Sequence, residues 1–435
     1  LLEPEEGELS FRMPSPLPDG KGIVFLVQSE GDAVDKVVLY SEGARRTVFE
    51  LPGESLEYAV VYRSGYLVYD RATSSPGIWA VALSLDEGRA SQARPFKVAE
   101  GTDPSVSRDG ALVFLDGTSV HEGKRFRLVW FDRAGTVLPI EGMRAKEMGY
   151  NVSLSKNEDQ ALVAVRDEKT ETTSIWRQRI DRPGVENQVT FPPSGESDFD
   201  PVWHPDGEHF FFRRSSLGLR KGRSLPLPIL KARIDGQDKP VELAKGVSFS
   251  ISEDGRFLTY EAPLPEEPNQ RGIAFLDFKQ KDLQPQFLPG ANEGRQRPLL
   301  SPDGRFVAFM RRRQNTPQYF LTRFPSGEGE WLISGRLTTR AFWGADPQQT
   351  AFYFYRMTGS DVREMKMTLP MDGREPDFEK TTVLYDVNEK YFQHYVVPGP
   401  SRDGQRFLVP QETDFEAQSQ RKLILKLNWV EEFGG

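Results

Sequence analysis

A ten-residue pattern that recurs along the chain constrains its fold more than any other feature. In each copy a turn, usually Asp-Gly, leads into a run of apolar residues, as in HPDGEHFFFR (204–213) and SPDGRFVAFM (301–310). Glycine adopts the positive φ of such a turn without steric cost, and the preceding Asp can bond the nearby backbone. The pattern therefore predicts a tight turn that enters a β-strand. Its glycines are Gly20, Gly110, Gly207, Gly255, Gly304 and Gly404.

The spacing of these glycines indicates a structural repeat. Gly207, Gly255 and Gly304 are separated by 48 and 49 residues, and the remaining intervals of 90, 97 and 100 residues are about twice as long. Weaker copies of the pattern lie near the midpoints of the long intervals, at 63–70, 156–165 and 344–355. The chain is therefore predicted to contain nine repeat units of about 48 residues.

Within a unit the apolar segments predict four short strands. Unit seven offers segments at 297–301, 305–310, 318–324 and 330–334, and unit four offers segments at 151–155, 160–165, 174–180 and 187–191. Unit nine ends after its third strand, at 421–429. Four antiparallel strands at this period are typical of the blades of a β-propeller, in which each blade buries its faces against its neighbours.

We therefore predict an all-β propeller of nine units, with residues 1–435 as one domain and eight or nine blades in the ring. A strand from the N-terminus, around Leu1 and Leu2, is expected to complete the last blade and cover its edge. In an alternative arrangement, residues 143–435 form a six-bladed ring and residues 1–142 belong to a partial second propeller. An open β-array is the remaining possibility, which its exposed edges disfavour.

The repeats resemble the PD40-type, WD40-like repeats of TolB-like propellers, most clearly in FDPVWHPDGEHFFF (199–212) and RPLLSPDGRFVAFM (297–310). Three segments resemble the extracytoplasmic propeller of eukaryotic-like serine/threonine kinases of Acidobacteria and related bacteria. They are residues 10–26, residues 126–138, and the C-terminal segment made of VPGPSRDGQRFLVPQ (397–411) and LILKLNWVEEF (423–433). This resemblance implies a periplasmic or cell-surface sensor. The resemblance assigns no catalytic residue to this chain, because the kinase motifs are absent from it: the glycine-rich loop, the VAIK lysine, HRD and DFG.

Charge and composition exclude several classes of function. The net charge of -8 disfavours nucleic acid and anionic membrane surfaces as partners. The absence of cysteine removes disulfides, thiolate nucleophiles and cysteine-based metal sites. No apolar run is long enough to span a bilayer, and residues 1–10 do not resemble a signal peptide. Because the chain starts at Leu1, we expect a signal, anchor, kinase domain or further blades to belong to residues upstream of it.

The chain offers no convincing catalytic or metal site. The G-x-S-x-G motif of serine hydrolases is absent, and so is a D-x-D-x-D-G calcium loop. The histidines are His121, His204, His209 and His394. Ligands from different blades could still converge on a central metal, which leaves a propeller lyase or hydrolase as the alternative function. We favour a structural interpretation, in which His204 replaces the serine of the SPDG turn and His209 lies on a strand.

Two further groups of polar residues are candidates for binding. Basic residues crowd one loop of unit five and the end of a strand in unit seven, and we interpret them as solvated surface. They are Arg213, Arg214, Arg220, Lys221 and Arg223, and Arg311 to Arg313. Asp103 and Asp200, each before a proline, could line a channel mouth. We prefer the interpretation that they end a loop and bond backbone amides there.

These observations predict a non-catalytic module that binds a protein or a small molecule at a propeller face or channel. No cofactor and no metal is assigned, and the ligand itself is not identified by the sequence. A structural scaffold without a small ligand is a further alternative.

Overall fold

The computed structural model shows a nearly all-β chain made of antiparallel sheets. The structure describes residues 2, 5, 8–17, 20–29, 36–50, 56–63, 65–71, 75, 77–84, 89–90, 94–107, 110–116, 125–132, 134, 136–167, 169–170, 172–215, 226–267, 270–290, 294–313, 316–333, 341–344, 351–358, 361–368, 381–386, 399–413 and 422–433.

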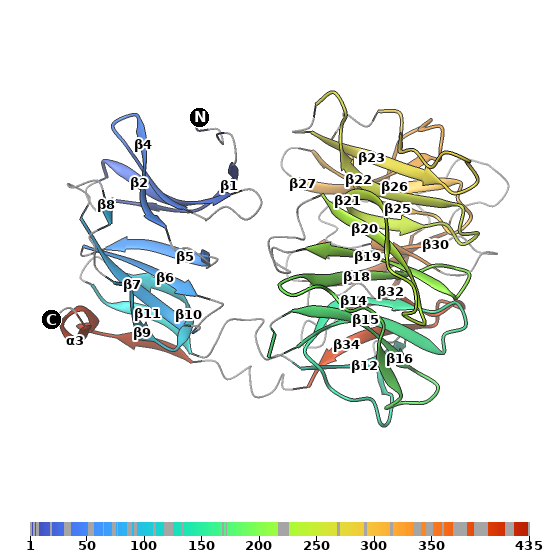
Figure 1. Cartoon of the computed structure of the whole chain (residues 1–435), viewed down its shortest axis with the longest axis horizontal. Helices are drawn as coiled ribbons and strands as arrows, with labels where there is room; N and C mark the ends of the chain where they lie inside the picture. Colours follow the sequence, from blue (N-terminus) through green and yellow to red (C-terminus); the bar gives the residue numbers. More distant parts are fainter. Residues whose placement is uncertain are drawn as a thin grey trace. The chain divides into compact units, whose positions relative to one another are not determined.

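The chain divides into two compact units (Figure 1). Residues 1–124 and 414–435 form the first, here called the terminal unit, and residues 125–413 form the second, the central unit. The alternative boundary expected from the sequence lay between residues 142 and 143, whereas the structure separates the units at residues 124 and 125. It also returns the last residues of the chain to the first unit.

The central unit contains six groups of antiparallel strands among its described residues. One strand, β21, is long enough to end the third group and begin the fourth, because its residues 241–246 pair with β20 and its residues 247–251 pair with β22. The groups are β12 (Phe126–Asp132), β13 (Val137–Pro139), β33 (Gly399–Pro400) and β34 (Arg406–Glu412); β14 (Met148–Leu154), β15 (Gln160–Arg166), β16 (Thr173–Arg179) and β17 (Glu186–Gln188); β18 (Ser197–Trp203), β19 (His209–Ser215), β20 (Leu227–Arg233) and β21 (Val241–Ile251); β21, β22 (Phe257–Pro263), β23 (Arg271–Asp277) and β24 (Gln286–Phe287); β25 (Gln296–Leu300), β26 (Phe306–Arg313), β27 (Thr316–Arg323) and β28 (Trp331–Leu332); β29 (Ala341–Trp343), β30 (Ala351–Thr358), β31 (Asp361–Thr368) and β32 (Thr381–Asp386). The strands expected for units four and seven are thereby confirmed.

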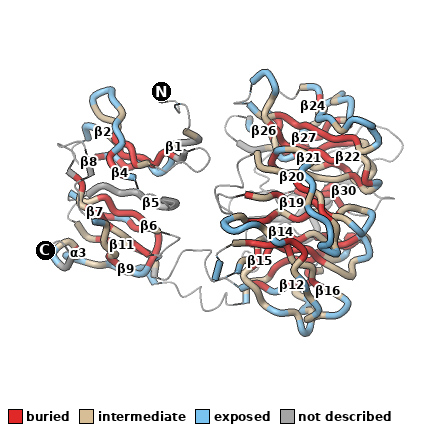
Figure 2. The backbone as a smooth tube through the Cα atoms, in the orientation of Figure 1, coloured by how far each residue is buried: buried red, intermediate tan, exposed pale blue. Residues whose placement is uncertain are grey.

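Shared hydrophobic clusters join each group to the next. The second strands are buried on both faces, as in β15, where all five residues from Ala161 to Val165 are buried. The buried segments lie along these strands in Figure 2. Each of the following pairs lies in one cluster: Ile175 with Phe210, Phe211 with Tyr260, Phe275 with Phe309, Leu321 with Phe352, Tyr353 with Phe407, and Phe407 with Val163. The clusters therefore link the sixth group back to the first and second.

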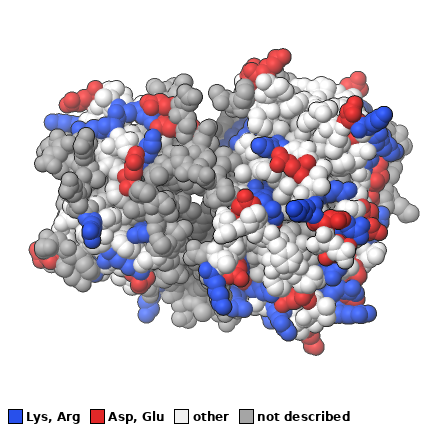
Figure 3. Space-filling model, in the orientation of Figure 1, with Lys and Arg blue, Asp and Glu red and all other residues white. Residues whose placement is uncertain are grey.

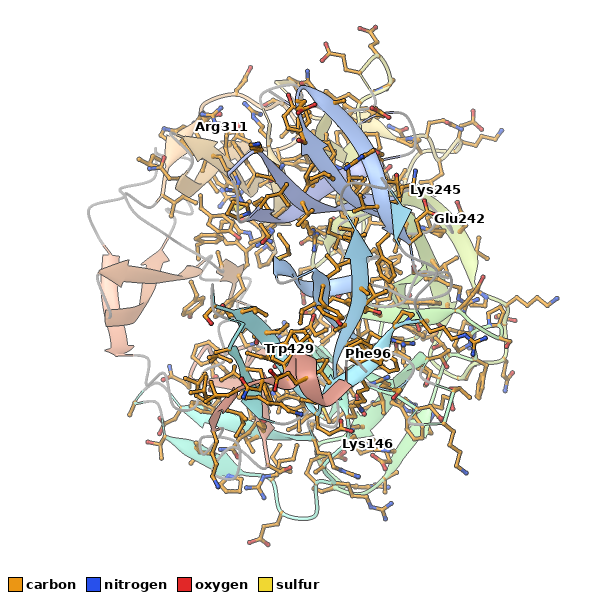
Figure 4. All side chains as sticks on the ribbon, turned by 90° about the vertical axis from the view of Figure 1, so that its left-hand side faces the viewer. Phe96, Lys146, Glu242, Lys245, Arg311 and Trp429 are labelled. Carbon is orange, nitrogen blue, oxygen red and sulfur yellow. The ribbon has the colours of Figure 1, made fainter. Side chains whose placement is uncertain are left out.

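The described residues of the terminal unit form three sheets. They are β1 (Glu8–Pro16), β2 (Gly22–Ser29), β3 (Lys36–Ser41) and β4 (Ala44–Glu50); β5 (Leu56–Arg63), β6 (Tyr66–Arg71), β7 (Gly77–Ser84), β8 (Arg89–Ala90) and β9 (Phe96–Ala99); and β10 (Gly101–Val106), β11 (Leu112–Asp116) and β35 (Leu423–Lys426), which leads to the short helix α3 (Trp429–Phe433). Trp429 is fully buried, and its Nε1 donates to the carbonyl of Gly110 at 2.9 Å. Figure 4 shows Trp429 and Phe96 close together beside this helix.

The predicted closure of the last blade by the N-terminus is wrong. The segment at 421–429 does not extend the last group of the central unit, because β35 pairs with β11 and Trp429 begins a helix. Strand β34 pairs instead with β12 over seven residue pairs, from Phe126–Glu412 to Asp132–Arg406. The apolar residues of β12 fill both of its faces, since Leu128, Val129 and Phe131 are all buried there. Leu2 packs on the first sheet, next to Phe25.

The predicted turns are confirmed. All six turn glycines have positive φ, between 60° and 87°. Turns of neighbouring groups also contact one another: the amide of Glu253 donates to the carbonyl of Pro302 at 3.0 Å, and Gly255 lies against the ring of His204. The weaker copy at 156–165 has the same turn, in which Glu158 takes the glycine position with a φ of 60°. Residues 345–350 of the copy at 344–355 lie outside the described residues.

Candidate functional site

A β-bulge interrupts the first strand of seven sheets or groups. The residues in these bulges form the candidate site. In the described strands the pairing register shifts within β1, β5, β10, β14, β18, β21 and β25. Bulges of this kind redirect a side chain and are common beside functional sites. Five bulges hold a non-glycine residue with a φ of 46° to 54°, namely Met13, Asp103, Asp200, Ser248 and Arg297.

These five residues occupy one position of the repeat, seven residues before the turn glycine. Asp200 precedes Gly207 by this interval, and Arg297 precedes Gly304 by the same interval. Asn151, in the bulge of β14, stands seven residues before Glu158, which replaces the glycine. A non-glycine residue in this conformation costs on the order of 1–3 kcal/mol unless its surroundings compensate, so such residues cluster at binding sites and active sites. We call Asn151, Asp200, Ser248 and Arg297 of the central unit the bulge row.

Buried acids of the preceding sheet support two of the bulges. Glu261 on β22 accepts a hydrogen bond from the amide of Arg297 at 3.1 Å, and Arg271 donates to its other oxygen at 3.2 Å. In the terminal unit Asp70 accepts a bond from the amide of Asp103 at 3.4 Å. Both acids are buried. They anchor the strained backbone and leave the side chains of Arg297 and Asp103 exposed.

The first pair of the bulge row is closed by its own hydrogen bonds. Asn151 Nδ2 donates to Asp200 Oδ1, and Arg213 donates to Asp200 Oδ2 from Nη2 at 2.6 Å and from Nε at 3.2 Å. Arg213 is buried on the face of Phe199, with 4.8 Å between the guanidinium carbon and the ring centroid. The Asp200 carboxylate therefore already has a neutral donor on Oδ1 and a charged donor on Oδ2.

The second pair, Ser248 and Arg297, has the same contact between its two strands but is open. Leu300 donates its amide to Ser250 Oγ at 3.1 Å, as Trp203 donates its amide to Ser153 Oγ at 2.8 Å in the first pair. These contacts lie at identical offsets from the bulge residues, so Ser248 stands to Arg297 as Asn151 stands to Asp200. Both side chains are exposed, and no described residue bonds the Ser248 hydroxyl or the Arg297 guanidinium.

The histidine pair lies on the turn between β18 and β19. His204 Nδ1 and His209 Nδ1 lie 3.0 and 2.7 Å from Asp206 Oδ2. Burial of Asp206 opposes its ionisation, but bonds from the Glu208 amide and the His209 ring outweigh it and lower the pKa of Asp206 to about 2. Burial lowers the pKa of His204. His204 therefore occupies the serine position of the turn, and His209 begins a strand, as the sequence predicted.

Three of the eight candidate basic residues are paired with acids. Arg214 binds Asp198 at 2.6 and 2.8 Å, Arg213 binds Asp200, and Arg311 binds Glu330. Acidic and basic side chains are interspersed over the central unit in Figure 3. Arg220, Lys221 and Arg223 lie outside the described residues, as do His121 and His394. The paired residues therefore carry no exposed anion site of their own.

The aspartates differ from the preferred interpretation. Asp103 and Asp200 lie within β10 and β18 and not at the end of a loop. The Asp200 carboxylate bonds the side chains of Asn151 and Arg213, so its expected role as a cap for backbone amides is wrong. Sequence reasoning missed Asn151, Ser248 and Arg297 because they share no residue type. The signal that identifies them in the sequence is their shared position, seven residues before the turn glycine or its replacement.

Among the described residues, no group of three or more His, Asp or Glu side chains is placed to hold a metal ion. No helix in the described part of the chain is long and apolar enough to cross a membrane.

Comparison with known proteins gives structural matches but no sequence family. No protein-family model matches the sequence, and no curated protein matches it. The solved structure of a putative TolB from Agrobacterium tumefaciens is similar, with 17% identity, a TM-score of 0.49, and coverage of 67% of this chain and 99% of that one. TolB from Acinetobacter baumannii has 12% identity, a TM-score of 0.42, and coverage of 82% and 80%. Oligogalacturonate lyase from Vibrio parahaemolyticus has 12% identity, a TM-score of 0.42, and coverage of 70% and 78%.

Proposed function

We propose that this chain is a non-catalytic binding propeller whose central unit closes as a six-bladed ring and presents its ligand site on the bulge row. The hydrophobic clusters support the ring, because they connect all six groups in order and return from β30 to β34 and β15. One group contains strands from both ends of the unit, because the hairpin of β12 and β13 pairs with β34, which in turn pairs with β33. This pairing joins the beginning of the central unit to its end.

The observation that carries the proposed function is the equivalence of the bulge residues. First strands of neighbouring groups contact each other, as β14 does with β18 and β21 with β25, so their bulges lie along one side of the fold. All four members of the bulge row are polar, and conformational strain is retained at each positive-φ position. A few fixed polar groups on rigid strands suit the binding of a polar ligand.

The proposed cellular role is that of a sensor outside the cytoplasm, either as part of a bacterial receptor kinase or as a TolB-like periplasmic protein. The resemblance of the repeats at 199–212 and 297–310 supports the TolB-like alternative, and the resemblance of residues 10–26, 126–138, 397–411 and 423–433 supports the receptor kinase. The partner is proposed to be a protein or a small molecule that occupies the bulge row. The net charge of -8 disfavours nucleic acid.

Small polar probes test the site. Ser248→Trp fills the open end of the bulge row, and Ser248→Ala is its matched control. We expect saturation-transfer NMR to detect binding of probes such as succinate, succinamide and short polar peptides to the wild type. This binding should be lost in Ser248→Trp, which blocks the site, and weakened but still detectable in Ser248→Ala, which removes only the hydroxyl. If no probe shows binding that depends on position 248, the bulge row is not the ligand site.

A further inference from the structure

We infer that Arg297 and Ser248 form a carboxylate-binding niche, which gives a ligand class to the proposed site and rests on the proposed function. The inference comes from two equivalent positions in one molecule, of which one is filled internally and the other is open. In the filled pair, a carboxylate lies between the amide of Asn151 and the guanidinium of Arg213.

The filled pair shows what the open pair lacks. Asp200 supplies the carboxylate of the first pair, whereas Arg297 stands at the Asp200 position in the second. The second pair therefore offers a guanidinium and a hydroxyl as donors, but no described side chain supplies an anion to them. A carboxylate from outside would restore the combination of charged and neutral donors that Asp200 receives.

The charge at the supporting position is also reversed between the two pairs. Arg213 and Glu261 both stand six residues after their turn glycines, Gly207 and Gly255. Arg213 neutralises Asp200 directly, whereas Glu261 is bound by Arg271 and accepts the backbone amide of Arg297. Because Glu261 is already engaged with these donors, it leaves the guanidinium of Arg297 free to bind a ligand.

The position of Arg297 limits the entropic cost of binding. Its backbone is fixed in a bulge with a φ of 51°, is followed by Pro298, and is held through its amide. A planar guanidinium can donate two parallel hydrogen bonds to one carboxylate, and such charge-assisted bonds are stronger than neutral ones. The ligand carboxylate can belong either to a small acid or to an acidic peptide, because both present the same group.

Binding of matched acidic and neutral probes tests the inference. The probes are succinate and acetyl-Glu-Glu-Glu-amide, with succinamide and acetyl-Gln-Gln-Gln-amide as their neutral counterparts. We expect the acidic probes to bind the wild type and to lose about ten- to a hundredfold in affinity in Arg297→Gln, measured by calorimetry. Arg297→Lys should retain part of the affinity, since it keeps the charge but loses the paired donors.

Arg182→Gln is the control, because Arg182 is an exposed arginine of the same unit whose nearest acid, Asp181, is 3.9 Å away. It should bind the acidic probes as the wild type does. Circular dichroism of each variant verifies that the fold is retained. Chemical shifts of the arginine side-chain nitrogens give a second readout, in which only the Arg297 signal should move on addition of an acidic probe.

The outcomes separate this inference from the proposed function. Equal affinity of wild type and Arg297→Gln for the acidic probes, or equal binding of acidic and neutral probes, overturns the carboxylate niche. If neutral probes then still bind in a way that Ser248→Trp abolishes, the bulge row remains a ligand site. Preference for succinate over the peptide, or the reverse, supports the niche and identifies the source of the carboxylate.

Discussion

At the residue scale, each turn is built from a small set of side-chain bonds that the sequence pattern encodes. In the turn at 252–257, Ser252 Oγ donates to Asp254 at 2.6 Å and accepts the amide of Phe257 at 2.9 Å. Ser301 and Ser401 make the same bonds in their turns. The turns could therefore be predicted from residue type alone. The bulges could not, because Met, Asp, Ser and Arg occupy one backbone position there.

The glycine of these turns provides a test of the backbone conformation. Gly304 has a φ of 67°, and a Cβ at this position would meet no atom closer than 3.9 Å. Gly304→Val should therefore destabilise through conformation and not through a clash, by roughly 1–2 kcal/mol. Gly304→Asn should cost less, because Asn tolerates this region. Urea unfolding of both variants measures the difference, and equal losses would contradict the conformational explanation.

His204 makes the stability of the central unit sensitive to pH. Its folded pKa is lowered below 6.5, so its contribution to the free energy of unfolding is complete above pH 6.5 and is lost as the pH falls through the lowered value. Asp206, with a pKa of about 2 against an ordinary value of 3.8, loses its contribution only below about pH 4. The free energy of unfolding should therefore decline less between pH 7 and pH 5 in His204→Ser than in the wild type.

Urea unfolding at pH 7 and pH 5 measures this effect. Ser252→Ala is a suitable control, since it weakens the neighbouring turn by about 1 kcal/mol, and the one titrating group that it contacts, Asp254, has an ordinary pKa of 3.8 and stays ionised between pH 7 and pH 5. The stability that Ser252→Ala loses relative to the wild type should be similar at both pH values. A wild-type decline that persists unchanged in His204→Ser would assign the pH dependence to other groups.

At the scale of elements, the identity of a strand is easier to predict than its partner. The four-strand pattern was correct for the groups that begin with β14 and β25, because alternation and turn residues are local. The partners of the last strands were not predicted, since β34 pairs with residues 274 or more positions earlier and β35 with residues more than 300 earlier. Periodicity holds no information about such distant pairing.

The C-terminal helix is the element whose role can be measured most directly. Trp429 is buried between the second and third sheets, where its ring lies 5.6 Å from that of Tyr66. Trp429→Ala should lower the stability of the terminal unit by about 3–5 kcal/mol. Glu431→Ala, which changes an exposed residue of the same helix, should have little effect. Hydrogen exchange should show the loss in residues 66–114 but not in the central unit, and a uniform loss would contradict this assignment.

At the scale of the whole molecule, the central unit begins and ends at neighbouring residues. Thr413 donates its amide to the carbonyl of Arg125 at 2.9 Å, and its hydroxyl donates to the same oxygen at 3.0 Å. Residues 125–413 should therefore fold alone as a monomer. A fragment of residues 143–413 lacks β12 and β13, exposes the edge of β34, and should melt lower and associate. Equal melting of the two fragments would contradict closure by this hairpin.

The antiparallel pairing of β12 with β34 also determines how the central unit responds to mechanical force. Phe126 and Glu412 face each other at one end of the ladder, so a pull applied at residues 125 and 413 loads its hydrogen bonds one after another. A pull at residues 125 and 406 loads them together, in shear. Because the chain has no cysteine, single-molecule handles can be attached at chosen positions through introduced cysteines. The first geometry should open the unit at much lower force than the second. The pairing of β12 with β34 is therefore expected to be weak against a pull at residues 125 and 413, where the chain enters and leaves the unit.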